Sequence, residues 1–151
     1  MVGDDRRTEV DGAAEAYLEV LDHHGVDYFF NSPGSEDSPF WEAFAKQAAE
    51  ESPDSRSITH VNCRHESVAV TMAKGYAMVT GRPQAVKLHV NVGPLHAAME
   101  MYGAEHSSVP MLVLGSYNST HEGELPGGTS GPHYLNYQHP GGHENNFARY
   151  V

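Results

Sequence analysis

Basic residues, cysteine and long apolar runs are all scarce in this 151-residue chain. Nine lysines and arginines stand against twenty aspartates and glutamates, which gives a formal net charge of -11 at pH 7. A surface of this charge repels nucleic-acid phosphates and anionic membranes, so nucleic acid is not an expected partner. Only three of the basic residues are lysines, a balance that is typical of salt-adapted proteins.

The single cysteine, Cys63, excludes an internal disulfide framework. No basic and apolar leader precedes the first expected helix, so the expected compartment is the cytoplasm. No apolar run approaches the roughly 20 residues that a membrane-spanning helix needs, and no membrane association is expected. With 39% hydrophobic residues, the chain still has enough apolar side chains to build the core of one domain.

Strands and helices are expected to alternate along the first 116 residues. Helical periodicity appears in three segments, residues 11–21, 66–79 and 95–106. A further helix is expected where Ser38 is followed by Pro39. Four short apolar runs predict strands, residues 26–30, 57–61, 85–90 and 111–114. This alternation predicts an α/β fold with a doubly wound, mainly parallel sheet flanked by helices.

The expected helix ends rest on capping residues. Asp11 is the candidate N-cap of the first helix, and Ser38 that of the second. His24 with Gly25 should end the first helix, and Gly81 should end the helix that begins at Glu66.

The last part of the chain differs in composition. Residues 122–143 are dense in glycine and proline, so no regular element is expected there. We therefore expect an α/β domain at residues 1–116 and a tail at residues 117–151 that is truncated or depends on a partner for its structure. Histidines and glutamates of the tail offer an alternative metal site, namely His121, Glu122, His133, His139, His143 and Glu144. Because no regular element would fix their geometry, no metal site is expected.

Polar residues follow three of the predicted strands. They lie in residues 31–35, 62–66 and 89–94. In open parallel sheets, ligands bind outside the carboxyl ends of the strands. Ser35, Glu66 and His89 are therefore expected on one rim of the sheet.

Several of these segments match a known family in order and spacing. Residues 64–77 (RHESVAVTMAKGYA) resemble the signature of the pyrimidine-binding domain in the acetolactate synthase and benzoylformate decarboxylase family of thiamine-diphosphate-dependent enzymes. Residues 30–35 with 39–40 resemble the "NPGS...PF" form found in benzoylformate decarboxylases. Residues 88–89 and 109–115 resemble later strands of the same domain.

The resemblance, which covers about residues 12–116, implies thiamine diphosphate as the cofactor and a 2-oxo acid as the substrate. It implies that Glu66 hydrogen-bonds to N1′ of the cofactor's aminopyrimidine and helps the cofactor to lose its C2 proton. Ser35 and His89 match positions that lie against the substrate carboxylate and relay protons. Further cofactor contacts are expected from loop residues, namely Pro33, Gly34, Asn91, Gly93 and His96.

The sequence also departs from the family pattern. Acetolactate synthases carry Gly-Pro-Gly and a later Asn in the third loop, whereas this loop has Gly93-Pro94 and then His96. The magnesium and diphosphate motif, Gly-Asp-Gly followed by Asn-Asn, does not occur. Magnesium is therefore expected only through a diphosphate-binding domain of the same or another chain, and this chain alone is expected to be inactive.

Two organisations of the enzyme are open at this point. The chain is either part of a longer 2-oxo-acid decarboxylase or carboligase, or one subunit of a split enzyme that resembles sulfopyruvate decarboxylase. A homo-oligomer is expected in either case. The alternative is a non-catalytic α/β binding or interaction module, in which Glu66 is an ordinary first-turn glutamate.

Overall fold

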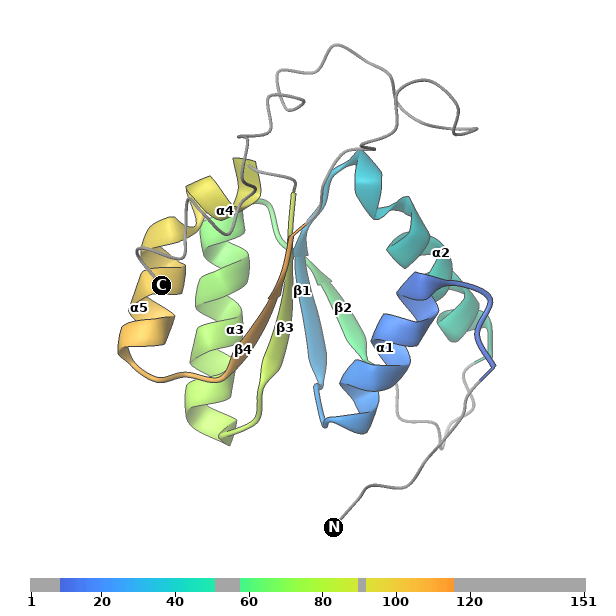
Figure 1. The fold of residues 1–151 in the computed structure, drawn as a ribbon, viewed down its shortest axis with the longest axis horizontal. Helices are drawn as coiled ribbons and strands as arrows, with labels where there is room; N and C mark the ends of the chain where they lie inside the picture. The colour runs from blue at the N-terminus through green and yellow to red at the C-terminus, as the bar shows by residue number, and fades with distance from the viewer. Residues whose placement is uncertain (1–8, 51–57, 90–91, 116–151) are drawn as a thin grey trace.

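The computed structural model describes residues 9–50, 58–89 and 92–115. These residues form a four-stranded sheet in the order β2-β1-β3-β4, in which all neighbouring strands are parallel (Figure 1). The strands are β1 (Tyr28–Ser32), β2 (Thr59–Asn62), β3 (Gln84–Leu88) and β4 (Met111–Leu114). The prediction of a parallel α/β sheet is therefore confirmed.

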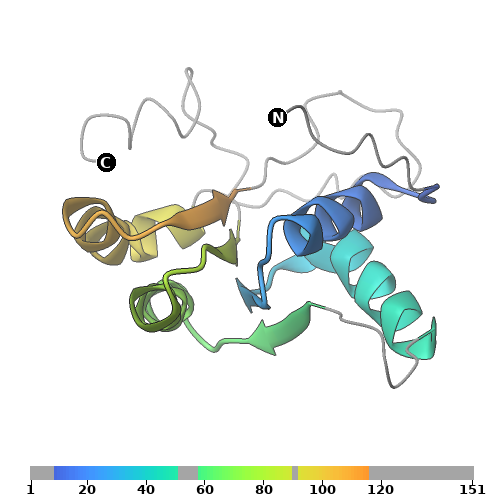
Figure 2. The same ribbon diagram turned by 90° about the horizontal axis from the view of Figure 1, so that it is seen from below.

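Helices cover both faces of the sheet. One face carries α1 (Ala13–His23) and α2 (Ser38–Glu50), the latter preceded by a short 3-10 turn, η1 (Ser35–Asp37). The other face carries α3 (Glu66–Thr80), α4 (Val92–His96) and α5 (Ala98–His106) (Figures 1 and 2). Because helices lie on both faces, the sheet is doubly wound, as the sequence predicts.

The apolar core has two layers because successive strand side chains point to opposite faces. On β1, Phe29 packs among the side chains of α1 and α2, whereas Phe30 packs among those of α3 and α5. On β3, Ala85 shares the cluster of Phe29, and Val86 shares that of Phe30. The central strands are thus buried on both sides, and polar residues within them stand out.

The first strand starts two residues later than predicted. The amide of Val26 donates to the carbonyl of Leu21 at 3.0 Å, and that of Gly25 donates to Asp22 at 2.9 Å. Together with the positive φ of Gly25, +79°, these bonds close α1 in a Schellman motif. Val26 is buried as part of the helix end and does not pair in the sheet.

The other strand bounds differ slightly from those predicted. β2 starts two residues later than residue 57, and β3 ends at Leu88, two residues before the predicted end. The fourth strand, Met111–Leu114, has its predicted bounds. Gly81, with a φ of +69°, ends α3 as expected.

Two predicted caps are wrong. The N-cap of α1 is Gly12, and the carboxylate of Asp11 instead binds the ammonium group of Lys46 at 2.7 Å. Ser38 lies inside a helical turn that has already begun, and its hydroxyl donates to the carbonyl of Ser35 at 3.2 Å. In both cases a short polar side chain binds another group instead of the backbone amides at the start of a helix.

The single helix predicted over residues 95–106 is divided in two. α4 ends at His96 and α5 starts at Ala98. The hydroxyl of Ser67 on α3 donates to the His96 carbonyl at 2.9 Å. That carbonyl is the one a continuous helix would use four residues later, so the contact with α3 lies at the break.

Among the residues that the structure describes, no helix has the length and apolar character that crossing a bilayer requires. The tail predicted to lack regular structure, residues 122–143, and its alternative metal site lie outside the described residues.

Candidate active site

The sheet order places a topological switch point between β1 and β3. The chain leaves β1 toward β2 on one side and returns to form β3 on the other side. Ligands of open α/β sheets bind at the carboxyl edge beside such a point. Ser35, Glu66 and His89 follow the carboxyl ends of β1, β2 and β3, so the predicted common edge is confirmed.

Glu66 occupies the first position of α3. The helix is capped by His65, whose Nδ1 accepts a hydrogen bond from the Ser67 amide at 3.2 Å. The approach to this helix is fixed by the Cys63 amide, which donates to the carbonyl of Asn31 at 2.7 Å. Although first-turn glutamates are usually solvated, Glu66 is only 8% exposed. Its carboxylate is thus held at the rim rather than released to solvent.

Two imidazoles flank the Glu66 carboxylate. Oε2 of Glu66 lies 3.2 Å from Nδ1 of His96 and 4.0 Å from Nδ1 of His65. The two rings stack with centroids 5.3 Å apart. Because an ionised carboxylate only accepts, Nδ1 of His96 carries the proton of that hydrogen bond when Glu66 is charged.

The same three side chains have the composition of a histidine and carboxylate metal site. One ligand atom from each of His65, Glu66 and His96 lies within 4.8 Å of the others. Nδ1 of His65, however, already accepts the Ser67 amide. A cation bound through Nδ1 would therefore have to displace this hydrogen bond.

Cys63 lies next to this group and packs in the apolar core. The thiol is buried, and this burial raises the pKa of Cys63. A cysteine reacts as its thiolate, so burial and a raised pKa both disfavour reaction at this position. Cys63 belongs to the core.

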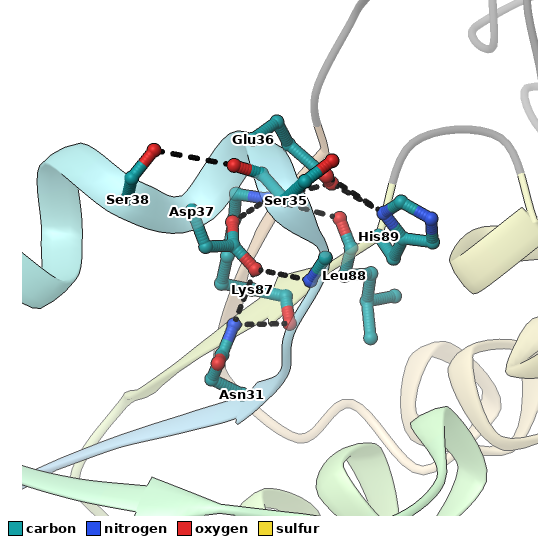
Figure 3. A network of polar contacts seen from close by, with 9 residues as sticks. Asn31, Ser35, Glu36, Asp37, Ser38, Lys87, Leu88 and His89 are labelled. Atoms are coloured by element: carbon teal, nitrogen blue, oxygen red, sulfur yellow. Dashed lines mark hydrogen bonds and ion pairs between the residues drawn. The ribbon is translucent and has the colours of Figure 1, made fainter.

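A second polar group lies between β1 and β3 (Figure 3). Asn31 and Lys87 are partners in the parallel register, and both project toward the start of α2. Lys87 is 3% exposed, and its Nζ lies 2.6 Å from Oδ1 of Asp37 and 3.7 Å from Oε1 of Glu36. It also donates to the carbonyl of Leu88 at 3.1 Å. A buried cation therefore lies between two carboxylates directly below the rim.

Asp37 is fully buried and is held from several sides. Its Oδ2 accepts the amide of Gly34 at 2.9 Å and the side-chain amide of Asn31 at 3.2 Å. These bonds pull Asp37 inward, and the preceding Glu36 points toward His89 (Figure 3).

His89 forms the outer end of this group. Its Nδ1 lies 2.7 and 2.8 Å from the two carboxylate oxygens of Glu36. A Cβ at Gly34 would overlap both the His89 ring and the Glu36 carboxylate. Only glycine therefore leaves room for the two side chains to meet over this backbone. Ser35, the next residue, is exposed.

The short helix α4 connects the two groups. The amide of Gly93 donates to the His89 carbonyl at 2.7 Å, whereas His96 contacts Glu66. Gly93 and His96 are three positions apart, which corresponds to a rise of about 4.5 Å along a helix. Gly93 and His96, both predicted to contact the cofactor, thus lie at the rim, as do Pro33 and Gly34; Asn91 lies outside the described residues.

The sequence analysis did not identify four members of the second group: Asn31, Glu36, Asp37 and Lys87. A lysine within the otherwise apolar run of β3 is the signal that could have revealed them. A buried lysine needs a carboxylate partner, and the two carboxylates after Ser35 are the natural candidates.

Gly93→Ala is expected to lower the free energy of unfolding by about 1–3 kcal/mol, because overpacking has this typical effect. A Cβ at this position would lie 2.9 Å from the Leu88 Cβ and 3.1 Å from its backbone carbonyl carbon. The matched control is Gly75→Ala on α3, where a Cβ meets nothing within 4 Å. There the free energy should rise by about 0.5–1 kcal/mol. Urea unfolding of both variants measures these changes. Equal changes in the free energy of unfolding for the two variants would contradict the prediction.

The chain was compared with protein families and with known proteins. A family described as "Thiamine pyrophosphate enzyme, N-terminal TPP binding domain" matches residues 12–140. Benzoylformate decarboxylase of Pseudomonas aeruginosa is 33% identical over 98 residues, which are 65% of this chain and 17% of that protein. The acetolactate synthase large subunit of Haemophilus influenzae is 32% identical over 101 residues, 67% of this chain and 16% of that protein.

Solved structures show a similar fold. A thiamine diphosphate-dependent 4-hydroxybenzoylformate decarboxylase of Rhodococcus jostii RHA1 superposes with a TM-score of 0.60 at 28% identity. The match covers 71% of this chain and 18% of that one. The chain thus spans less than a fifth of the length of these relatives.

Proposed function

Because the chain belongs to the family of thiamine pyrophosphate enzymes and matches their N-terminal TPP binding domain, we propose that it serves a 2-oxo-acid decarboxylase or carboligase. In this proposal it holds the aminopyrimidine half of thiamine diphosphate. The observation that carries the proposal is the mostly buried carboxyl of Glu66 at the carboxyl edge of the sheet.

The residues at this edge fit an aminopyrimidine. Such a ring offers nitrogens that accept hydrogen bonds and an amino group that donates them, and Glu66 with its flanking imidazoles supplies complementary groups. When bound, thiamine diphosphate supplies a carbon nucleophile for the 2-oxo acid and an electron sink for the bond that breaks. Glu66 would share its proton with N1′ of the aminopyrimidine. Pro33, Gly34, Gly93 and His96 would line the ring.

The substrate side of the proposal rests on His89 and Ser35. Both lie at the switch point, and His89 is 22% exposed at its side chain, enough for a ligand to reach the ring. His89 would move a proton to or from the 2-oxo acid, and the Ser35 hydroxyl would contact its carboxylate.

The remaining parts of the enzyme must come from elsewhere. A domain of the same or another chain would hold the diphosphate and magnesium, because the Gly-Asp-Gly motif does not occur in this sequence. We further propose that the protein is a homo-oligomer in the cytoplasm. The single cysteine supports the proposed compartment, because disulfide frameworks are rare there.

A substrate panel tests the proposed function. The protein, together with its diphosphate-binding domain, thiamine diphosphate and Mg²⁺, is offered a panel of 2-oxo acids that includes benzoylformate and 4-hydroxybenzoylformate, the acids in the names of two of its relatives. We expect cofactor-dependent release of CO₂ from at least one 2-oxo acid. Cofactor binding without turnover of any 2-oxo acid would instead support a non-catalytic module. The masses of the chains in the native complex distinguish one long chain from the two subunits of a split enzyme.

A further inference from the structure

Glu36 and His89 meet in a way that fixes which ring nitrogen carries the proton. Nδ1 lies within hydrogen-bond distance of both carboxylate oxygens, at 2.7 and 2.8 Å. An ionised carboxylate has no proton to donate, so Nδ1 must carry the hydrogen in this contact. Nε2 is then the nitrogen whose protonation can change, and it points away from Glu36 (Figure 3).

Neighbouring charged groups hold the Glu36 carboxylate in place. Lys87 lies 3.7 Å from Oε1 of Glu36 and is itself anchored by Asp37 at 2.6 Å. Asp37 is fixed in turn by the amide of Gly34. An ammonium group that is almost fully buried interacts with a carboxylate far more strongly than one in water.

We propose that Glu36 is the positioning residue of His89, and that Lys87 and Asp37 hold it in that role. Glu36 keeps the proton on Nδ1, so that Nε2 alone exchanges a proton with the substrate. In that exchange the Nε2 lone pair accepts a proton, or Nε2–H donates one, while the Nδ1–H bond stays intact. The role of His89 toward the substrate rests on the proposed function, whereas the fixed tautomer does not.

Carboxylates fix the tautomer of catalytic histidines in the same way in other enzymes. A histidine in the wrong tautomer presents an N–H where a lone pair is needed, and catalysis fails although the geometry is intact. Here the carboxylate comes from the loop after β1 and the histidine from the end of β3, 53 residues later. Neither residue is recognisable as half of a pair from its local sequence.

The experiment uses ¹⁵N NMR of the imidazole rings in the intact protein, at a pH where the ring is neutral. Loss of one set of signals in His89→Gln assigns His89. We expect the population of the Nδ1–H tautomer to exceed that of the Nε2–H tautomer by more than about tenfold, because a charge-assisted hydrogen bond stabilises the first form. Glu36→Ala should abolish this preference. Glu42→Ala, on the exposed part of α2, should leave it unchanged.

Two further variants keep the test decisive if Glu36→Ala folds poorly. Glu36→Gln retains an acceptor oxygen and should preserve part of the preference. Gly34→Ala keeps both side chains but forces them apart, and should therefore lose the preference. A wild-type His89 that is mainly Nε2–H, or a preference that survives both Glu36→Ala and Gly34→Ala, would overturn the proposal.

Activity separates this inference from the proposed function. With the diphosphate-binding domain present, Glu36→Ala should lower kcat by about tenfold or more with little change in KM. If no 2-oxo acid is turned over, the proposed function fails while the tautomer result stands. If turnover occurs and kcat is unchanged by loss of the tautomer preference, the positioning role is wrong.

Discussion

Glu66→Gln is expected to slow C2 hydrogen-deuterium exchange of bound thiamine diphosphate by about a hundredfold to ten-thousandfold, the usual contribution of a general acid or base. Glutamine keeps the size and shape of the side chain but cannot give up or take back a proton at the ring nitrogen. The exchange is measured in the complete enzyme, in which the diphosphate-binding domain is present.

The control for this prediction is Glu105→Gln on α5. Glu105 is exposed, and such a substitution typically changes stability by no more than about 0.5 kcal/mol and should leave exchange untouched. The result depends on Glu66→Gln retaining the fold and binding the cofactor, which circular dichroism and cofactor titration establish. Full C2 exchange in such a variant would reduce Glu66 to an ordinary first-turn residue.

Lys87→Met should lower the free energy of unfolding by about 3–5 kcal/mol, the typical effect of removing one partner of a buried ion pair. Asp37 is fully buried and would lose the only cation that the described residues place against it. The side chains are similar in volume, so the change reports mainly on charge. Urea unfolding, with comparable slopes for both proteins, measures it.

A double variant shows whether charge is the cause. Asp37→Asn in the Lys87→Met background keeps an oxygen for the Gly34 amide and removes one buried negative charge, so much of the stability should return. Lys46→Met, which removes a surface ion pair with Asp11, should have a far smaller effect. If Lys87→Met is as mild as Lys46→Met, the second polar group does not stabilise the fold.

Features that are set by a few adjacent residues were predicted correctly from the sequence. The strand Met111–Leu114 and the left-handed end of α3 at Gly81 follow from a few adjacent residues. Glu66 was expected at the rim because its strand, loop and helix are contiguous in the chain, and parallel strands bring their carboxyl ends to one edge. Its role toward the cofactor was implied by the family resemblance of residues 64–77.

Features that depend on distant partners were missed. Asn31 and Lys87 are 56 residues apart and meet only because β1 and β3 are neighbours in this register. At the break between α4 and α5, the His96 carbonyl is bound by Ser67, which lies 29 residues earlier in the chain. Neither contact can be predicted from spacing in the sequence. The lysine within the apolar run of β3, however, gives a reason to look for a polar partner of Lys87.

The position of α4 has a thermodynamic consequence. One end of this helix is hydrogen-bonded to the His89 backbone and the other contacts Glu66, so displacement of either end is transmitted to the other. Two ligands that bind at opposite ends of such an element are energetically coupled, and the coupling is reciprocal. Under the proposed function, a cofactor ring that shifts His96 would change the affinity for an acid at His89 by a certain factor. The acid must then change the affinity for the cofactor by the same factor, so binding titrations in either order measure one coupling free energy.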